Sequence, residues 1–430
     1  MGDFIVVVGV DLSDDVRHNQ PSTNWDTMNN SIKRFMIFAC LSVGLATSLF
    51  AQDVTITIKS DEKPKVEVKD DGKPAFTGTR PAVDVAILLD TSNSMDGLIS
   101  QAKSQLWTIV QQFAKAEKAG KTPQLRVSVF EYGNTNLPAS ENYIRQVVQL
   151  TDDLDAVSEA LFSLKTKGGD EYCGTVINEA VKRLDWSGKA NSYKAIFIAG
   201  NEPFTQGPTD YKDGCKAAID NGITVNTIHC GDYQTGISTK WKDGAELAEG
   251  EYMNIDQDRK TVHIETPHDD IIIKLNAELN KTYLWYGDAP TKQRLRSNQL
   301  AQDSNSAMAG KSAQISRFST KGGSAYSNVN RDLVDSFEAD DKVLEKVKES
   351  DLPESMQRMS KEERATHISE MTNARKQIQA QIKAEVAKRD KLVSAKRKEL
   401  AETAGEATLG DAMSAAVVRQ LKASGFEVKK

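Results

Sequence analysis

The sequence predicts an α/β fold: a doubly wound, mostly parallel six-stranded sheet, followed by an α-helical C-terminal region with a long amphipathic helix. Two observations support this fold class. From Val83 onward, short apolar runs alternate with segments of helical periodicity, and residues 361–400 keep helical spacing without glycine or proline. Alternation of strands and helices favours a parallel sheet, because each crossover connection lays a helix on one face of the sheet.

Six apolar runs are the predicted strands, at residues 83–89, 125–132, 143–150, 195–199, 223–228 and 252–255. Only Asp84 interrupts the first of them. Helical spacing predicts helices at residues 98–118, 154–164, 176–184 and 271–284. The first helix carries its apolar stripe on Leu98, Ala102, Leu106, Ile109 and Phe113.

The chain of 430 residues is long enough for more than one folded unit. We expect an α/β domain over residues 83–287, a polar linker with short helices over 288–340, and a helical, coiled-coil-like region over 341–430. The apolar stripe of the long helix comprises Ala365, Ile368, Met371, Ile378, Ile382, Val386, Val393 and Leu400. This stripe must be buried on a partner helix, on the α/β domain or in a dimer, so self-association through residues 361–400 stays open.

The end of the chain adds two further expectations. A shorter helix is expected over residues 409–421, and it could fold back on the long one. The excess of lysine and arginine between Arg375 and Lys398 is either a solvated helix face or a surface for an acidic partner.

The N-terminal part reads as a targeting signal. Lys33 and Arg34 precede an apolar run that ends in Phe-Ala-Gln, which predicts a signal peptide over residues 28–51 with cleavage after Ala51. A transmembrane anchor is the alternative, but the run is shorter than the roughly 18 residues that span a bilayer. Residues 1–27 are then a disordered extension upstream of the true start, and residues 52–82 a linker with a short β segment. We expect an extracytoplasmic protein, periplasmic or secreted, without stable membrane insertion after cleavage.

Composition narrows the classes of partner. The net charge of −6 argues against nucleic acid, and 39% hydrophobic with 27% charged residues is typical of a soluble globular protein. Cys173, Cys215 and Cys230 lie beyond the signal. One disulfide among them and three buried thiols are both compatible with the sequence.

The loop after the first strand carries the chemistry. It reads Asp90-Thr91-Ser92-Asn93-Ser94-Met95, between an apolar strand and a helix. Loops at the carboxyl ends of parallel strands form the ligand sites of such folds. One carboxylate and two hydroxyls on a tight turn suit Mg²⁺, or Mn²⁺ or Ca²⁺, which prefer oxygen ligands. Asp90, Ser92 and Ser94 are also ordinary helix-capping and turn residues, so the short motif has a structural alternative.

The stretch Val-Asp-Val-Ala-Ile-Leu-Leu-Asp-Thr-Ser-Asn-Ser-Met, residues 83–95, resembles the opening of a von Willebrand factor A domain with its metal-ion-dependent adhesion site. The resemblance covers about residues 82–287. It implies that Asp90, Ser92 and Ser94 form the first element of the site and Thr175 the second. In that family, serine and threonine hydroxyls touch the metal, acids often act through water, and the ligand's carboxylate fills a vacant position.

The third element departs from the family pattern. The family has an aspartate after its fourth strand, whereas this chain has Ala-Gly-Asn-Glu-Pro-Phe. Asn201 or Glu202 is then the expected source of an outer oxygen, and Asp170 or Glu171 of additional charge. Thr175 as a helix cap and Glu202 as a solvated acid are the alternatives. The stretches Gly-Gly-Asp-Glu-Tyr-Cys-Gly and Gly-Asn-Glu-Pro-Phe look similar to a bacterial subgroup of exported proteins with this domain.

Enzyme motifs do not account for the chain. It has no His-Glu-x-x-His, Gly-x-Ser-x-Gly or Gly-x-x-x-x-Gly-Lys sequence, and His229 beside Cys230 is interpreted as a core or rim residue. We therefore expect no enzyme but a divalent-cation-dependent binding module, which presents Mg²⁺ to an Asp or Glu of a protein partner. The alternatives are a metal-free scaffold assembled through the long helix, and a hydrolase that uses Asp170, Glu171 and the metal.

Overall fold

A computed structural model describes residues 80–96, 98–189, 191–255, 263–404 and 409–428, which belong to one compact unit, Phe76–Lys430. The predicted extension, signal peptide and nearly all of the predicted linker lie outside the described residues. Among the residues that are described, no helix has the length and apolar content needed to cross a membrane.

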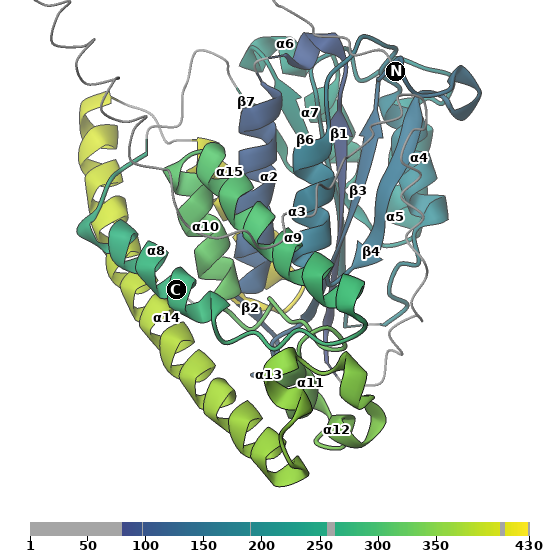
Figure 1. Cartoon of the computed structure of the whole chain (residues 1–430). Coiled ribbons are helices and arrows are strands. Elements are labelled where there is room, and N and C mark those ends of the chain that lie inside the picture. Colours follow the sequence, from purple (N-terminus) through teal and green to yellow (C-terminus); the bar gives the residue numbers. More distant parts are fainter. Residues whose placement is uncertain (1–79, 97, 190, 256–262, 405–408, 429–430) are drawn as a thin grey trace, which may run out of the picture. The chain divides into compact units, whose positions relative to one another are not determined.

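A six-stranded sheet forms the centre of the described chain (Figure 1). Its strands are β1 (Ala82–Asp90), β3 (Gln124–Tyr132), β4 (Ile144–Thr151), β5 (Tyr193–Gly200), β6 (Thr224–Cys230) and β7 (Tyr252–Ile255). Their order is β4-β3-β1-β5-β6-β7, and β4 is antiparallel to β3 while the other pairs are parallel. The prediction of a mostly parallel, doubly wound sheet is confirmed. The strand order reverses between β1 and β5, and such a reversal point opens a ligand crevice at the carboxyl ends of the strands.

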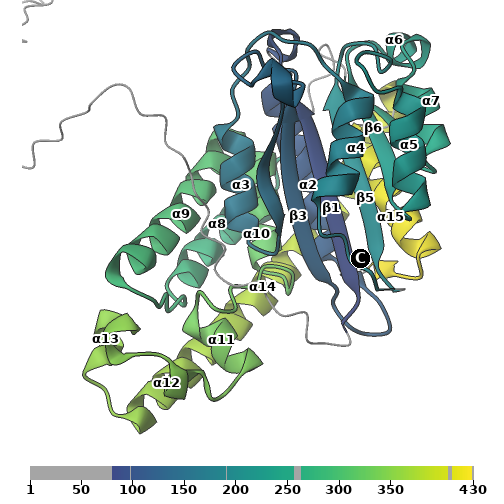
Figure 2. The ribbon, with the colours of Figure 1, turned by 90° about the vertical axis from the view of Figure 1, so that its right-hand side faces the viewer.

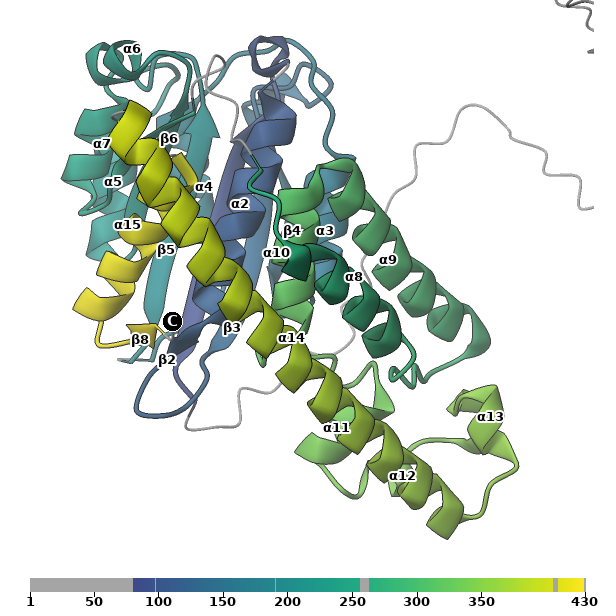
Figure 3. The same ribbon diagram turned by 90° about the vertical axis from the view of Figure 1, so that its left-hand side faces the viewer.

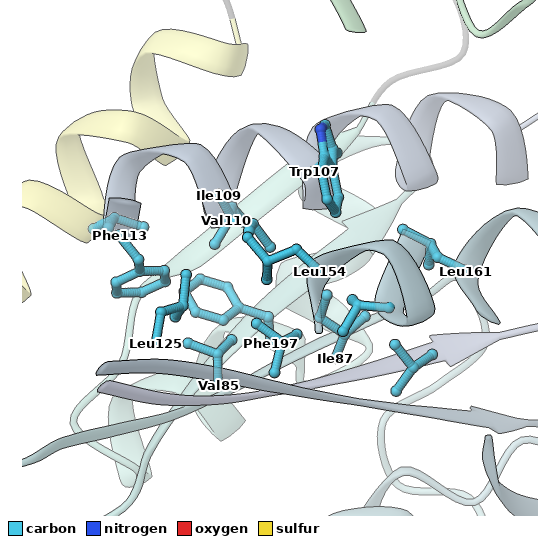
Figure 4. Close-up of a cluster of buried hydrophobic side chains, with 14 of the residues drawn as sticks. Val85, Ile87, Trp107, Ile109, Val110, Phe113, Leu125, Leu154, Leu161 and Phe197 are labelled. Atoms are coloured by element: carbon cyan, nitrogen blue, oxygen red, sulfur yellow. The ribbon is translucent and has the colours of Figure 1, made fainter. Parts of the chain in front are cut away.

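Helices cover both faces of the sheet, as alternating connections require (Figures 1 and 2). α2 (Ile99–Ala114) and α3 (Leu154–Ser163) cover one face, and α4 (Cys173–Arg183), α5 (Tyr211–Asp220) and α7 (Trp241–Leu247) the other. The short helix α6 (Tyr233–Ser238) follows β6. Figure 4 shows the core between α2, α3 and the sheet, with Val85, Ile87, Trp107, Ile109, Val110, Phe113, Leu125, Leu154, Leu161 and Phe197 labelled.

Asp84, the one polar residue of the first predicted strand, is buried inside the sheet. Arg126 of β3 binds both of its carboxylate oxygens, through Nε at 2.9 Å and Nη2 at 2.7 Å. The backbone N–H of Ser187 donates a third hydrogen bond at 2.7 Å. The acid is therefore fully compensated, and the strand continues through it.

Two predicted helices have different bounds for identifiable reasons. The first ends at Ala114 rather than residue 118, because Ala116–Glu117 form the short strand β2, which pairs with β8 (Glu427–Val428). The last helix of the predicted α/β domain is α8 (Pro267–Asn280) rather than residues 271–284. It begins early because Thr266 and Asp269 make a capping box around Pro267.

Residues 288–340 contain longer helices than the short ones we predicted. α9 (Ala289–Met308) spans 20 residues and packs with α10 (Lys311–Lys321) and α3. Buried charge pairs join α9 to α10, in addition to apolar residues such as Leu295, Ile315 and Phe318 that enter the core. Arg317 and Lys321 of α10 are 0% exposed and bind Asp303 of α9 at 2.6 and 2.8 Å. Composition alone does not reveal such pairs, and the segment therefore resembles a polar linker.

The C-terminal helices pack on the same unit. Its remaining helices are α11 (Leu333–Ala339), α12 (Val343–Lys346), α13 (Glu354–Gln357), the long α14 (Lys361–Ala404) and α15 (Leu409–Ala423). α14 runs beside α8 and also contacts α10 and α11 (Figure 3). Its stripe residues Ile368, Ile382, Val386 and Val393 are buried within the chain. The stripe packs on α8, the last helix of the predicted α/β domain, and on the later helices α10 and α11.

α15 does not fold back on the long helix as predicted. It packs on α2 and on β7, and Val417, Leu421 and Phe426 join the core on that face of the sheet. Its Gln420 exchanges hydrogen bonds with Asn226 of β6. The last helix of the chain thus covers part of the sheet that the first helices leave open.

Candidate functional site

The first loop begins where β1 ends, at the fully buried Asp90. One carboxylate oxygen, Oδ1, accepts the backbone N–H of Ser92 at 2.7 Å. The other, Oδ2, is buried and has no hydrogen-bond partner among the described residues. Asp90 does not cap the helix that follows, since the short helix there has Ser92 as its N-cap and α2 has Leu98. Buried polar atoms are normally hydrogen-bonded, so this oxygen is a candidate contact for a cation or ligand.

A chain of short contacts joins the first loop to the loop after β5. The Oγ atoms of Ser92 and Ser94 are 2.7 Å apart. Ser94 Oγ donates to Oδ1 of Asn201 at 2.9 Å. Asn201 follows Gly200, the last residue of β5, which is the direct neighbour of β1 in the sheet. Of the two third-loop candidates, Asn201 is the one whose side chain reaches the serines.

The second loop contributes Thr175 and Glu171. Thr175 is the third residue of α4, whose N-cap is Tyr172, so the alternative of Thr175 as a cap is wrong. Its side chain is 4% exposed, and its Oγ1 has no partner among the described residues. Glu171 is 6% exposed, whereas Asp170 is exposed and accepts a hydrogen bond from the Tyr172 hydroxyl at 3.3 Å. Of the two neighbouring acids, Glu171 lies in the interior.

Two buried side chains, Trp241 and His229, contact backbone carbonyls of the third loop. The sequence alone did not assign them this role. Nε1 of Trp241 donates to the carbonyl of Glu202 at 2.8 Å. Nε2 of His229 lies 3.3 Å from the carbonyl of Asn201, a contact that needs the proton on that nitrogen. His229 is 1% exposed, which agrees with its interpretation as a core or rim residue. Its position at the end of a strand was the available signal, because such ends meet at one edge of the sheet.

Close backbone approaches bring the three loops together. A side chain at Gly200 would place its Cβ 2.5 Å from the Tyr132 hydroxyl, and one at Gly169 would place it 2.3 Å from the carbonyl oxygen of Gly133. Gly133 itself has φ of +75° and follows β3. Only glycine permits these approaches, so the three positions shape the site although none carries a functional group.

The electrostatics of the cluster are unfavourable without a cation. Burial raises the pKa of Asp90 to about 7, and the nearby Glu171 and Glu202 add to the increase against hydrogen bonds from Ser92. Burial likewise raises the pKa of Glu171 to about 7, opposed by a hydrogen bond from Ser92 and reinforced by Glu202 and Asp170. Neither carboxylate has an ion pair with any described Lys, Arg or His. A bound cation would relieve both groups.

The donors available are oxygen atoms. In the described part of the chain, no three His, Cys, Asp and Glu side chains gather into a metal-holding group. A metal site here therefore depends on the hydroxyls of Ser92, Ser94 and Thr175 as well as on carboxylates. The orphaned oxygens of Asp90 and Thr175 fit a small hard cation such as Mg²⁺, which takes a few protein oxygens and keeps water on the rest.

The cysteines offer no alternative chemistry. Cys173, Cys215 and Cys230 are buried free thiols, so of the two readings of the sequence the three thiols are observed rather than a disulfide. Burial raises the pKa of all three well above the ordinary value of a thiol, and the reactive thiolate is therefore disfavoured. A Cys/His pair of Cys230 with His229 is not supported.

One family model and several solved structures are similar to part of this chain. The model of the von Willebrand factor type A domain matches residues 84–243. The protein BatB from Bacteroides thetaiotaomicron is 18% identical over 41% of this chain and 91% of its own, with a TM-score of 0.32. The SpRpn10 VWA domain is 16% identical over 42% and 90%, with a TM-score of 0.32.

Proximal thread matrix protein 1 from the mussel byssus, solved with a zinc-occupied MIDAS motif, is 13% identical over 42% of this chain and 43% of its own, with a TM-score of 0.30. No curated protein matches the chain. The match to the family model and the sheet order lead to one conclusion: residues 84–243 form a von Willebrand factor type A domain.

Proposed function

We propose that the chain is an extracytoplasmic, divalent-cation-dependent protein-binding module, which presents Mg²⁺ to an acidic residue of a partner in adhesion or assembly. The observation that carries this proposal is Asp90. Its carboxylate is 0% exposed, has no basic partner among the described residues, and leaves Oδ2 without a hydrogen bond. Burying an unpaired carboxylate costs several kcal/mol, and a coordinated cation offsets that cost.

Asp90, Ser92, Ser94 and Thr175 are the residues that would hold the cation. When bound, Mg²⁺, or Mn²⁺ or Ca²⁺ in its place, supplies a positive centre that accepts a further oxygen ligand from outside. Asn201 fixes the Ser94 hydroxyl by accepting its hydrogen bond. Glu202 is half-buried, with its backbone carbonyl held by Trp241, and Asp170 is exposed, so we leave both outside the proposed ligand set.

The class of partner follows from the fold and the charge of the chain. Von Willebrand factor A domains often mediate protein–protein interaction and are generally interaction modules rather than enzymes. The net charge of −6 disfavours nucleic acid. A protein that offers an Asp or Glu carboxylate is therefore the proposed ligand, and we assign no catalytic residue.

The extracytoplasmic location rests on the signal peptide predicted over residues 28–51. Two of the structures similar to this chain are described as an aerotolerance-related membrane protein and a pilus adhesin. Recovery of the mature protein from a periplasmic or medium fraction, with its N-terminus at Gln52, tests this part.

The two alternatives receive less support. A scaffold assembled through residues 361–400 needs a free apolar stripe, whereas Ile368, Ile382 and Val386 are already buried within the chain. A hydrolase that uses Asp170 together with Glu171 needs both acids at the metal, whereas Asp170 is exposed and bonded to Tyr172. The binding module remains the function that the geometry favours.

Calorimetric titration of the full chain with Mg²⁺ and Mn²⁺ tests the proposal. We expect saturable binding that Asp90→Ala abolishes, because the variant removes the only carboxylate of the first loop. Asp96→Ala, an exposed acid just beyond that loop, serves as the control and should bind as the wild type does. Equal binding by Asp90→Ala and wild type would falsify the site. Partner capture from a native extract should then require both Mg²⁺ and Asp90.

A further inference from the structure

Glu171 is a second buried carboxylate beside Asp90, and the ligand set above leaves it without a role. The surroundings of Gly133 show how close the carboxylates of Asp90 and Glu171 are to each other. A Cβ atom built on Gly133 would lie 2.8 Å from Cγ of Glu171 and 2.9 Å from Oδ1 of Asp90. Both side chains therefore border the same small space, which exists because residue 133 has no side chain.

The other buried acids of the described chain are all paired with a base. Eight acidic side chains are buried, and six of them contact an arginine or lysine: Asp84, Glu131, Asp155, Asp269, Asp303 and Asp332. The two that do not are Asp90 and Glu171. The fold thus supplies a base wherever it buries an acid except at this point, where two acids adjoin.

The third loop contacts the serines through a neutral side chain, while the Glu202 carboxylate acts on Asp90 and Glu171 only through space. Asn201 is neutral and its Oδ1 is engaged by Ser94 at 2.9 Å. Glu202 is half-buried, and its backbone carbonyl is held by Trp241 at 2.8 Å. The negative charges that border Gly133 therefore come from the first and second loops.

We infer that Glu171 supplies the second negative charge of the cation site, and that Asn201 acts as a neutral anchor that holds Ser94 in place. Two carboxylates then match the charge of one divalent cation. This inference rests on the proposed cation site and specifies which residue balances the charge there. It also explains why an asparagine is sufficient on the third loop.

Mn²⁺ titration of the full chain, followed by electron paramagnetic resonance, tests Glu171→Gln against Asp170→Asn. The second variant removes the neighbouring, exposed acid and is the matched control. We expect Glu171→Gln to weaken Mn²⁺ binding about 10- to 100-fold, as loss of supporting ligands at metal sites does, and Asp170→Asn to change it less than twofold. Wild-type affinity in Glu171→Gln, with binding lost in Asp90→Ala, overturns the inference and leaves the proposed site intact. Wild-type Mn²⁺ affinity in Asp90→Ala would contradict both the role of Glu171 and the proposed cation site.

The double variant Glu171→Gln, Asn201→Asp separates charge from shape. It returns one negative charge to the site on the third loop. If the charge of Glu171 is what the cation needs, the double variant recovers most of the lost affinity. No recovery overturns the charge assignment, because Glu171 would then act through its shape or its contact with Ser92. Thermal melting with chelator is the folding control: Glu171→Gln removes a buried unpaired charge, so its melting temperature should equal or exceed that of the wild type.

Discussion

Two regions of this molecule bury acids in opposite ways. At the contact of α3, α9 and α10, Asp303 binds Arg317 at 2.6 Å and Lys321 at 2.8 Å, and the amides of Asn276 and Asn280 complete its shell. Burial raises the pKa of Asp303, but Lys321 and Arg317 outweigh it and lower the pKa to about 2. At the sheet rim, burial without a base raises the pKa of Asp90 to about 7.

The contrast shows that burial alone does not decide the state of an acid. Both aspartates are removed from water, yet their pKa values lie on opposite sides of the ordinary 3.8 because their neighbours differ. Paired charges hold helices together, whereas the unpaired acid at the end of the central strand β1 is where we propose that a cation binds. In this fold the unpaired acids are therefore the better guide to function.

The largest expected effect comes from removing residues 405–430, which contain α15 and β8. This deletion exposes the surface of α2 and β7 on which α15 packs. Val417, Leu421 and Phe426 leave the core, and each contributes about 1.5–3 kcal/mol, or roughly 4–9 kcal/mol together. A typical domain has about 5–15 kcal/mol in all, so the shortened chain should be largely unfolded at 25 °C.

Circular dichroism and urea unfolding measure this directly. Lys422→Ala on the exposed face of α15 is the control and should stay within about 0.5 kcal/mol of the wild type. A shortened chain that unfolds cooperatively with wild-type stability would show that the sheet and its other helices are stable without α15.

Arg317→Ala should have the next largest effect, because it leaves both Asp155 and Asp303 without a guanidinium. Breaking a buried ion pair from one side costs about 3–5 kcal/mol. Arg419→Ala breaks an exposed pair with Glu251 and should cost less than about 1 kcal/mol in the same urea unfolding experiment. Equal losses in the two variants would mean that the buried network is no stronger than a surface pair.

The pH dependence of stability should differ in sign between the two regions. In the metal-free folded chain, Asp90 and Glu171 keep protons up to pH about 7, so their contribution to the free energy of unfolding falls as pH rises from about 4 to about 7. Asp303 behaves in reverse. Its contribution is present above pH about 4 and is lost as pH falls through about 2.

Urea unfolding of the wild type with chelator at pH 5 and pH 7.5 measures the fall in the free energy of unfolding that we expect from Asp90 and Glu171. Asp90→Asn should make the free energy of unfolding depend less on pH. Saturating Mg²⁺ should restore the stability of the wild type at pH 7.5 but not that of the variant. An unchanged slope in Asp90→Asn would place the responsible titration elsewhere.

Much of the sheet follows from the sequence, because period and apolarity are local properties. The strands from Val83 to Ile255 and the first loop with Asp90, Ser92 and Ser94 were predictable in this way. The choice between adjacent loop residues was not. Asp170 and Glu171 differ only in which one packs beside Gly133, and Asn201 differs from Glu202 only in its contact with Ser94. Loop sequences have no regular spacing of apolar residues. Contacts with residues far along the chain therefore determine which loop side chain points inward.

The same reason explains the C-terminal differences. The buried face of α9 is mostly polar, and its contacts with α3 and α10, among them the ion pairs of Asp303, show that it is a long packed helix. α15 has a stripe that fits several surfaces, and its hydrogen bond to Asn226 shows which one it covers. Periodicity identifies that a helix has a buried face but does not identify the partner.

The packing of α15 on β7 has a consequence for folding during synthesis on the ribosome. The sheet is complete in sequence by Ile255, yet Val417 and Leu421 are synthesised far later. At about 5–20 residues per second, the ribosome needs roughly 10–30 s to reach them. During that interval the surface of α2 and β7 that α15 later covers stays exposed to solvent. We therefore expect the last part of folding to follow release of the C-terminus from the ribosome.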